Sequence, residues 1–311
     1  MLMIEFPIIP DESSKNLSRI FRQSLENRIL KGAVSASRDL ELIRALLCGL
    51  SILELCLIID QEKDFDLRVD QLSPCGTTNS FKLKPGLKIF NLGQTPEGLD
   101  ISPLTNNELA GQSIALSRVL NHLKGIDPAQ YAEIGGIVRE VIFCKGHQFY
   151  GLSDRASIGR LYIGSPSDQQ LREFGGDSNF RLELFIGEQL IHENAHNVLM
   201  MAEALNQLYR NPNRHSIYSP LRHQKRSDQG VFHAFFVLSR LLHFYHQILA
   251  SGPEEFRRPV EYRLGRIRSD FDYLAQEIAR ERKDIFTPTG HLLFQKILNH
   301  NSIRMPHVSQ Y

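Results

Sequence analysis

The stretch GEQLIHENAHNVLMM, residues 187–201, combines an apolar helical pattern with a His-Glu-x-x-His motif. His192 and His196 are four residues apart, so on an α-helix they project from nearly one face, one turn apart. Two imidazoles placed in this way can chelate one divalent metal ion. Glu193 lies about 60° further round the helix than His196. From there its carboxylate can reach the edge of such a site, as a base for metal-bound water or as a hydrogen-bonding partner.

The motif is short, so it leaves two interpretations open: a metal site, or two histidines on a helical surface. Two observations favour the metal site. The helix is apolar around the motif, and a buried glutamate and two buried histidines need partners because unpaired burial is costly. The histidines are also clustered, since seven of the twelve lie between positions 192 and 246. These seven are His192, His196, His215, His223, His233, His243 and His246.

A third metal ligand must come from elsewhere in the chain. The longest zinc-protease motif would need glycine at position 199 and histidine at position 202, where this chain has Leu199 and Ala202. Glu203 shares the face of His196 but lies about 10 Å further along the axis, so we expect it to be solvated or to contact a ligand indirectly. His233, in the apolar run GVFHAFFVL, is the predicted third ligand, with a core histidine as the alternative.

The composition limits the function classes. A net charge of +1 gives no support for a general nucleic-acid or membrane-surface binder. The N-terminus lacks the pattern of a signal peptide, and the apolar run 43–59 contains charged residues and is too short for a typical membrane span. The four cysteines are scattered and form no CxxC, which is typical of reduced thiols. We therefore expect a cytoplasmic protein.

The pattern along the chain predicts an α+β fold that is mostly helical with a small antiparallel sheet. The metal site is expected between the HExxH helix and a following helix that carries His233. Helical periodicity appears in 12–60, 106–124, 181–208, 230–250 and 254–283. Strand-like segments occur in 62–103, 135–146 and 155–164, and 210–230 reads as a basic loop. We expect one catalytic domain over 1–311, with a helical N-terminal lobe at about 1–60 and a catalytic core at about 125–300.

The motif HENAH, followed by YSPLRHQKRSDQGVFHAFFVLSR, resembles the HExxH-type α-ketoglutarate-dependent peptide β-hydroxylases of bacterial peptide natural-product pathways. In that family a Ser-Pro-x-Arg loop and a Gly-x-x-His helix follow the HExxH helix. The resemblance covers about residues 135–250, and the first hundred or so residues match nothing comparable. The loop departs from the family in having LRHQKRS where a second aromatic residue or proline is usual. The matching residues are Ser219, Pro220, Arg222, Gly230, His233 and Arg240.

The resemblance implies Fe(II), α-ketoglutarate and O₂, and a precursor peptide or protein as substrate. Three histidine ligands would leave two metal positions for α-ketoglutarate and one for O₂. The distal carboxylate of α-ketoglutarate needs a cation, preferably a bidentate arginine. Arg240 lies seven residues after His233, on nearly the same helix face and about two turns away. It is the first candidate for this anchor, and Arg222 and Arg226 are alternatives from the loop. Arg240 could instead be a basic residue at the edge of an apolar helix, and Arg222 and Arg226 could belong to a solvated basic loop.

Two other functions remain open. The first is a zinc-dependent HExxH metallopeptidase, in which Glu193 would be the general base for a metal-bound water. In an oxygenase Glu193 would lose that role and could orient groups bound to the iron. The second is a helical peptide-binding or scaffolding protein whose histidines are structural. The missing protease third-ligand pattern and the apolar helix with His233 favour the oxygenase.

Overall fold

The computed structural model describes residues 81–84, 87–92, 100–147, 149–155, 158–175, 181–219 and 224–303. The expected helical lobe at about 1–60 and the strand-like part of 62–80 lie outside these residues. Most described residues are helical and accompany a small sheet, so the α+β class is confirmed. The elements are β1 (Phe81–Lys84), β2 (Leu87–Asn91), β3 (Ile101–Ser102), α5 (Asn106–Ile126), α6 (Pro128–Ile137), β4 (Glu140–Gly146), β5 (Gly151–Ser153), β6 (Arg160–Gly164), α7 (Asp168–Gly175), α8 (Leu182–Leu205), β7 (His215–Ser219), β8 (Gln224–Ser227), α9 (Asp228–Ser251), η2 (Glu254–Phe256), α10 (Arg257–Ile285) and α11 (Pro288–Ile303).

The sheet is mixed, and the prediction of an antiparallel sheet is wrong at its centre. The strand order is β1-β2-β4-β6-β5, and β3 also pairs with β4. The β2–β4 and β4–β6 pairs are parallel, whereas β1, β3 and β5 pair antiparallel with their neighbours. Parallel strands need a long crossover. Here α5 and α6 form the crossover between β2 and β4. The strand β5 follows β4 and precedes β6 in the chain, and it lies at the outer edge of the sheet.

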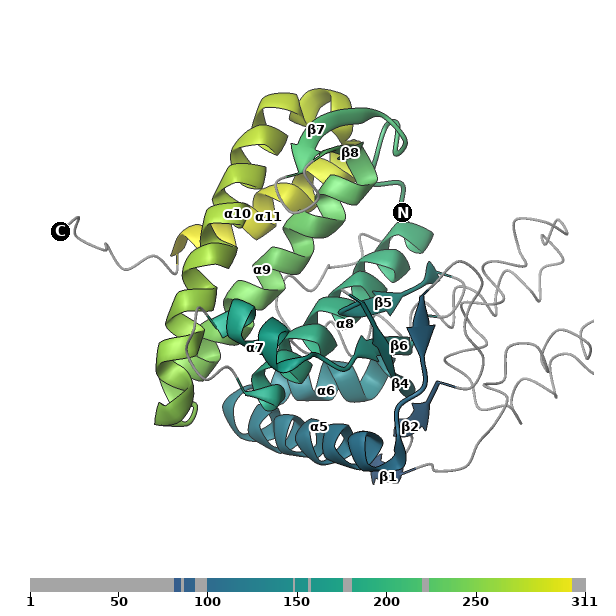
Figure 1. Cartoon of the computed structure of the whole chain (residues 1–311). Helices are drawn as coiled ribbons and strands as arrows, with labels where there is room; N and C mark the ends of the chain where they lie inside the picture. Colours follow the sequence, from purple (N-terminus) through teal and green to yellow (C-terminus); the bar gives the residue numbers. More distant parts are fainter. Residues whose placement is uncertain are drawn as a thin grey trace, which may run out of the picture.

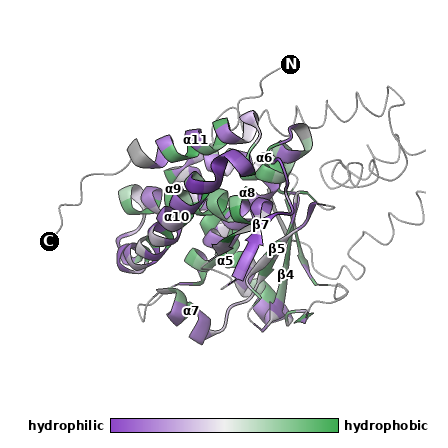
Figure 2. Cartoon of the chain, turned by 90° about the horizontal axis from the view of Figure 1, so that it is seen from above, coloured by the Kyte–Doolittle hydropathy of each residue, from purple (hydrophilic) through white to green (hydrophobic). Residues whose placement is uncertain are grey.

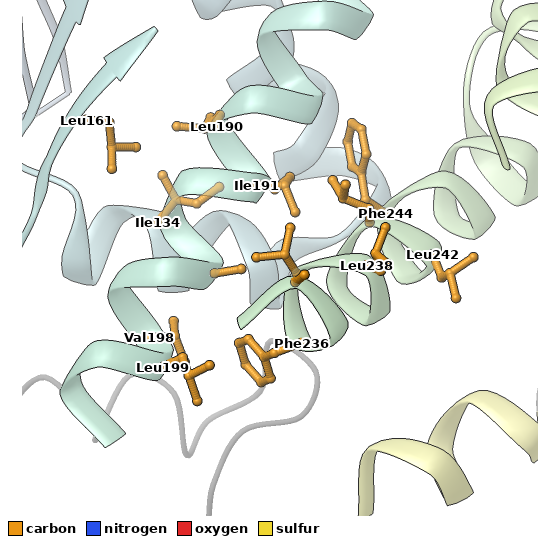
Figure 3. Close-up of a cluster of buried hydrophobic side chains, with 14 of the residues drawn as sticks. Ile134, Leu161, Leu190, Ile191, Val198, Leu199, Phe236, Leu238, Leu242 and Phe244 are labelled. Carbon is orange, nitrogen blue, oxygen red and sulfur yellow. The ribbon is translucent and has the colours of Figure 1, made fainter. Parts of the chain in front are cut away.

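The helix α8 packs against α5 and α9 and against the sheet at β5 and β6 (Figure 1). Figure 3 shows how apolar side chains fill the space between these layers: Leu190 and Val198 come from α8, Phe236 from α9, Ile134 from α6 and Leu161 from β6. In Figure 2 the buried centre of β4 is green, for hydrophobic. The HExxH motif therefore sits on one of the most enclosed helices of the described chain.

The long helices were predicted well, and two shorter features were not. The expected helices over 106–124, 181–208 and 230–250 correspond to α5, α8 and α9. The expected basic loop over 210–230 contains the β7–β8 hairpin and the first residues of α9. We predicted a strand from position 135, but α6 runs to Ile137 and β4 begins only at Glu140. The order Asp-Pro at the start of α6, an N-cap followed by a proline in the first turn, was the signal for this helix.

Asp127 forms the joint between α5 and α6. Its backbone N–H donates to Leu123 O and ends α5. Its side-chain Oδ1 accepts a hydrogen bond from the backbone N–H of Gln130 at 3.0 Å and so begins α6. Its other carboxylate oxygen lies 2.7 Å from Nε2 of His243 on α9. One buried side chain thus connects three helices with no intervening loop.

Cys144 lies in the buried middle of β4, and burial raises the pKa of its thiol to about 12. A thiol needs to lose its proton to react as a nucleophile, so burial suppresses both access and ionisation. We expect iodoacetamide at pH 8 to leave Cys144 unmodified in the folded protein and to alkylate it in concentrated urea. Peptide mapping by mass spectrometry measures this for each cysteine separately. Alkylation of Cys144 in the folded protein would contradict the burial.

Within the described residues, no helix is both long and apolar enough to cross a membrane. The apolar run 43–59, on which the expectation from the sequence was based, lies outside the described residues.

Candidate functional site

The motif side chains project from α8 as the helical spacing predicts. The ring centroids of His192 and His196 are 5.0 Å apart, and the two rings meet edge to face. The side chain of His192 is 35% exposed, whereas Glu193 is buried. The histidine pair is therefore partly accessible to solvent, whereas the Glu193 carboxylate points into the protein.

His233 on α9 meets His196 across the helix interface. The Nδ1 atoms of the two rings are 3.0 Å apart, and the rings are nearly parallel, at 25°. A hydrogen bond between the two imidazoles has this separation. Two nitrogen ligands about 2.1 Å from a shared ion, at right angles to each other, would also be about 3 Å apart. The predicted contact between the HExxH helix and His233 is therefore observed, and His196 is the residue of the motif that makes it.

Glu203 holds His233 from the opposite side. Its Oε1 lies 2.8 Å from Nε2 of His233. Because an ionised carboxylate only accepts hydrogen bonds, Nε2 is the nitrogen that carries the proton. In the neutral imidazole this leaves the lone pair of Nδ1 directed at His196. Carboxylates orient metal-binding histidines in the same way.

The Glu203 carboxylate collects several donors. Tyr209 donates its hydroxyl proton to Oε1 at 2.6 Å, Gln229 donates to Oε2 at 2.9 Å, and Arg155 forms a salt bridge with Oε2. Burial alone would raise the pKa of Glu203, but the hydrogen bonds from His233 and Tyr209 and the charge of Arg155 lower it overall. Glu203 is therefore a buried, ionised acceptor. The expectation of a solvated residue is wrong: the Glu203 carboxylate is 5% exposed and contacts His233, whose role as a metal ligand stays a prediction.

Glu193 is held by the edge strand β5. Ser153 Oγ donates to Oε2 of Glu193 at 2.7 Å. The other oxygen, Oε1, lies against Gly151, where an added Cβ would come within 2.6 Å of it, and 4.0 Å from Nε2 of His192. The glycine thus leaves the space that the carboxylate occupies. Neither Gly151 nor Ser153 stood out in the sequence, because nothing local links them to a helix some forty residues later.

The three predicted metal ligands do not form one closed set. Among the residues that the structure describes, no group of three or more His, Cys, Asp or Glu side chains is arranged to hold a metal ion. His196 contacts both His192 and His233, but as two pairwise contacts. The metal site between the two helices therefore stays a prediction.

Arg240, the first candidate for the α-ketoglutarate anchor, lies deep in the core. Its guanidinium forms a salt bridge with Glu133 of α6, and the two side chains are 1% and 0% exposed. Asn194 of α8 also donates to Glu133, at 2.7 Å. An ion pair between α6 and α9, with a hydrogen bond from α8, explains this arginine without any ligand. The anchor role stays a prediction, and the pairing with Glu133 argues against it.

Arg226 has a different environment, and Arg222 lies outside the described residues. Arg226 is half-buried on β8, and its guanidinium packs over Gly230 in the first turn of α9. A Cβ added at Gly230 would lie 3.3 Å from both Nε and Nη2 of Arg226. Gly230 precedes His233 by three residues, so the guanidinium lies about one helical turn from this histidine.

A second carboxylate lies behind His192, one turn earlier on α8. Glu188 is buried and accepts hydrogen bonds from Arg263 at 2.8 and 2.5 Å and from the Tyr245 hydroxyl. Burial would raise the pKa of Glu188, but the charge and hydrogen bonds of Arg263 and the hydrogen bond of Tyr245 lower it overall. This cluster fixes α8 to α9 and α10. The only sequence signal for this cluster is the position of Glu188 on the motif helix, four residues before His192.

A scan against models of known protein families found no match for this chain, and a search of curated proteins found none either.

Proposed function

We propose that this chain is an Fe(II)/α-ketoglutarate-dependent oxygenase that hydroxylates a side-chain β-carbon of a ribosomally made peptide. The observation that carries the proposal is the pair formed by His196 and His233, with Nδ1 atoms 3.0 Å apart and Glu203 behind the second ring. Metal-binding histidines usually donate their other ring N–H to a carboxylate, as His233 does to Glu203.

The residues fit an iron site at two of the three predicted ligands. His196 and His233 present nitrogens at a separation suited to one ion. His192 would supply the third nitrogen, and its partly exposed ring adjoins His196. Three histidines leave positions open for a co-substrate, as in other non-haem iron oxygenases. When bound, iron would couple decarboxylation of α-ketoglutarate to succinate and CO₂ with hydroxylation of a C–H bond, one oxygen atom of O₂ entering each organic product.

Arg226 is the better-placed candidate for the distal carboxylate of α-ketoglutarate. It is half-buried, lies one turn from His233 and is held over a glycine. A guanidinium in this position can form two parallel hydrogen bonds with a carboxylate. To bind α-ketoglutarate, Arg240 would first have to break its salt bridge with Glu133. This would leave a buried carboxylate without its cation, which is costly.

Glu193→Gln separates an oxygenase from a hydrolase. In an oxygenase no general base for water is needed, so the variant should keep measurable turnover, since the amide oxygen can still accept from Ser153. A hydrolase that uses Glu193 as general base would lose about 10²–10⁴-fold in rate. The measurement is turnover with bound metal quantified in the same sample. Complete inactivity of Glu193→Gln with metal retained would count against the oxygenase.

A zinc-dependent peptidase is the second candidate, and one observation favours it. The Glu193 carboxylate is buried, fixed by Ser153 and 4.0 Å from Nε2 of His192. A carboxylate beside a metal-binding histidine is where a hydrolase needs its base for metal-bound water.

Titration of the protein with α-ketoglutarate under anaerobic Fe(II) tests the proposal. We expect a metal-to-ligand charge-transfer band that saturates with α-ketoglutarate, and a weaker affinity in Arg226→Ala. Loss of one partner of a buried charge pair costs roughly 2–5 kcal/mol, or about 30- to several-thousand-fold in affinity. Iron binding without any response to α-ketoglutarate, or stoichiometric zinc with peptidase activity, would replace the oxygenase by the hydrolase. Absence of metal binding would leave a structural role for the histidines.

A further inference from the structure

The strand β5 has one open edge in the described part of the chain. It is the last strand in the sheet order, and its partner in the sheet is β6. The backbone N–H of Gly164 donates to the carbonyl of Tyr150 at 2.9 Å. Hydrogen-bonded and non-hydrogen-bonded pairs alternate along antiparallel strands. Tyr150 and Leu152 therefore direct their backbone groups at β6, and those of Gly151 and Ser153 point away from it.

The same two residues contact the motif glutamate. Ser153 Oγ donates to Glu193, and the Glu193 carboxylate rests against Gly151. A further strand hydrogen-bonded to Gly151 and Ser153 would lie about 4.8 Å from β5. At that distance it would pass beside Glu193, next to the His192–His196 pair. The open edge is thus continuous with the candidate site.

A cavity of about 630 Å³ begins at the other end of β5. Tyr150, which directly precedes Gly151, is part of its wall. The wall also carries three carboxylates, from Asp100, Glu108 and Glu173, and one ammonium group, from Lys145. Lys145 is already paired with Glu108 at 2.6 Å. The remaining charge of the wall is negative, which suits a positively charged side chain.

We propose that β5 is the docking strand for an extended substrate peptide, and that the acidic cavity beyond Tyr150 receives a lysine or arginine of that peptide. The identification of the peptide as substrate rests on the proposed function. The docking itself rests on the edge and the cavity. Peptides add to sheet edges through main-chain hydrogen bonds, which tolerate many sequences, while side-chain pockets provide the selectivity. Tyr150 precedes Ser153 by three residues. The basic side chain of the peptide therefore lies about three residues from the peptide residue beside Glu193.

Binding of synthetic peptides to the full chain tests the docking mode without any metal. The probe is a fluorescein-labelled dodecapeptide of Thr, Ser and Gln with one central lysine, and its binding is followed by anisotropy. Two modified probes carry N-methyl groups on either the odd or the even residues, excluding the lysine. Only every second residue of an added strand bonds to the edge. We therefore expect one modified probe to lose at least tenfold in affinity and the other to bind within about threefold of the parent.

Protein variants test the edge and the cavity separately. Ser153→Pro removes the outward N–H and should weaken the parent probe, whereas Ser153→Ala, which also loses the hydroxyl, should not. Glu173→Lys should weaken the lysine probe roughly fivefold and favour a probe with glutamate in its place. Glu261→Lys, an exposed charge reversal on α10, is the matched control.

Equal binding of the two N-methylated probes, or no binding of the parent probe, would overturn the docking strand. Equal effects of Glu173→Lys and Glu261→Lys would overturn the cavity. Self-association of the chain that the probe disrupts would assign the edge to a second copy and also overturn the proposal. The α-ketoglutarate titration on the same preparation keeps the hypotheses apart. Peptide binding without a response to α-ketoglutarate would leave the docking standing while the oxygenase fails.

Discussion

Arg240→Ala is expected to lower the free energy of unfolding by roughly 3–5 kcal/mol, because it leaves the Glu133 carboxylate buried without its cation. Both side chains are almost completely enclosed, and Asn194 would be the remaining donor to Glu133 seen among the described residues. Urea unfolding followed by circular dichroism measures the loss. Because the pair connects α6 to α9, the effect should appear as a lower midpoint of the whole transition.

Replacing both partners separates the ion pair from other roles of Arg240. A Glu133→Gln and Arg240→Met double variant removes both charges together, and it should recover much of the lost stability, since apolar or neutral replacements of a buried pair are often tolerated. If Arg240→Ala unfolds at the same urea concentration as the parent and binds α-ketoglutarate far more weakly, the assignment of Arg240 as anchor from the sequence is right. The structural role of the ion pair would then be wrong.

Loss of the central histidines should have the largest effect on metal binding. We expect His196→Ala and His233→Ala each to reduce the affinity for Fe(II) or Zn(II) by more than 100-fold. Removing an orienting partner alone costs about 10–100-fold, which is the loss expected for Glu203→Ala. Glu203→Gln should recover part of it, because its amide oxygen can still accept from His233. Metal content after equilibrium dialysis against a competing chelator measures all four variants.

His243→Ala is the matched control for these variants. His243 is also a buried histidine on α9, paired with the Asp127 carboxylate away from the HExxH motif. Its replacement should lower stability but preserve metal affinity in the folded protein. Equal metal loss in His243→Ala and His233→Ala would show that folding, and not ligation, controls the result. Full metal occupancy in His233→Ala would remove His233 from the ligand set.

The parts predicted well from the sequence were those with a strong local signal. The two central helices have long apolar patterns, and the spacing of His192 and His196 fixed their common face. The parallel centre of the sheet was missed because strand direction depends on which connections cross the sheet. Most of α6 lies between the predicted helix 106–124 and the predicted strand 135–146, and only its last three residues fall in that strand. The β7–β8 hairpin was missed because its polar residues resemble a loop.

Contacts between distant residues explain the remaining differences at the site. The partner of Arg240 is 107 residues away in sequence, and that of Glu193 is 40 residues away. Helical phase correctly placed Arg240 on a face shared with His233, but phase alone did not indicate that α6 would supply a carboxylate there. The axial distance of Glu203 from His196 argued against direct metal binding, but it did not indicate that Glu203 meets His233 on the neighbouring helix.

The joint at Asp127 sets a limit on how the chain can be re-engineered. Connections between helices are usually the first choice for inserting a tag, a reporter domain or new chain ends. Here the connecting residue ends one helix, begins the next and contacts a third, so extra residues would separate three sets of hydrogen bonds at once. The turn between helices α5 and α6 is therefore a poor insertion site. A circular permutant opened there should fold less readily than one opened in the exposed part of the β7–β8 hairpin.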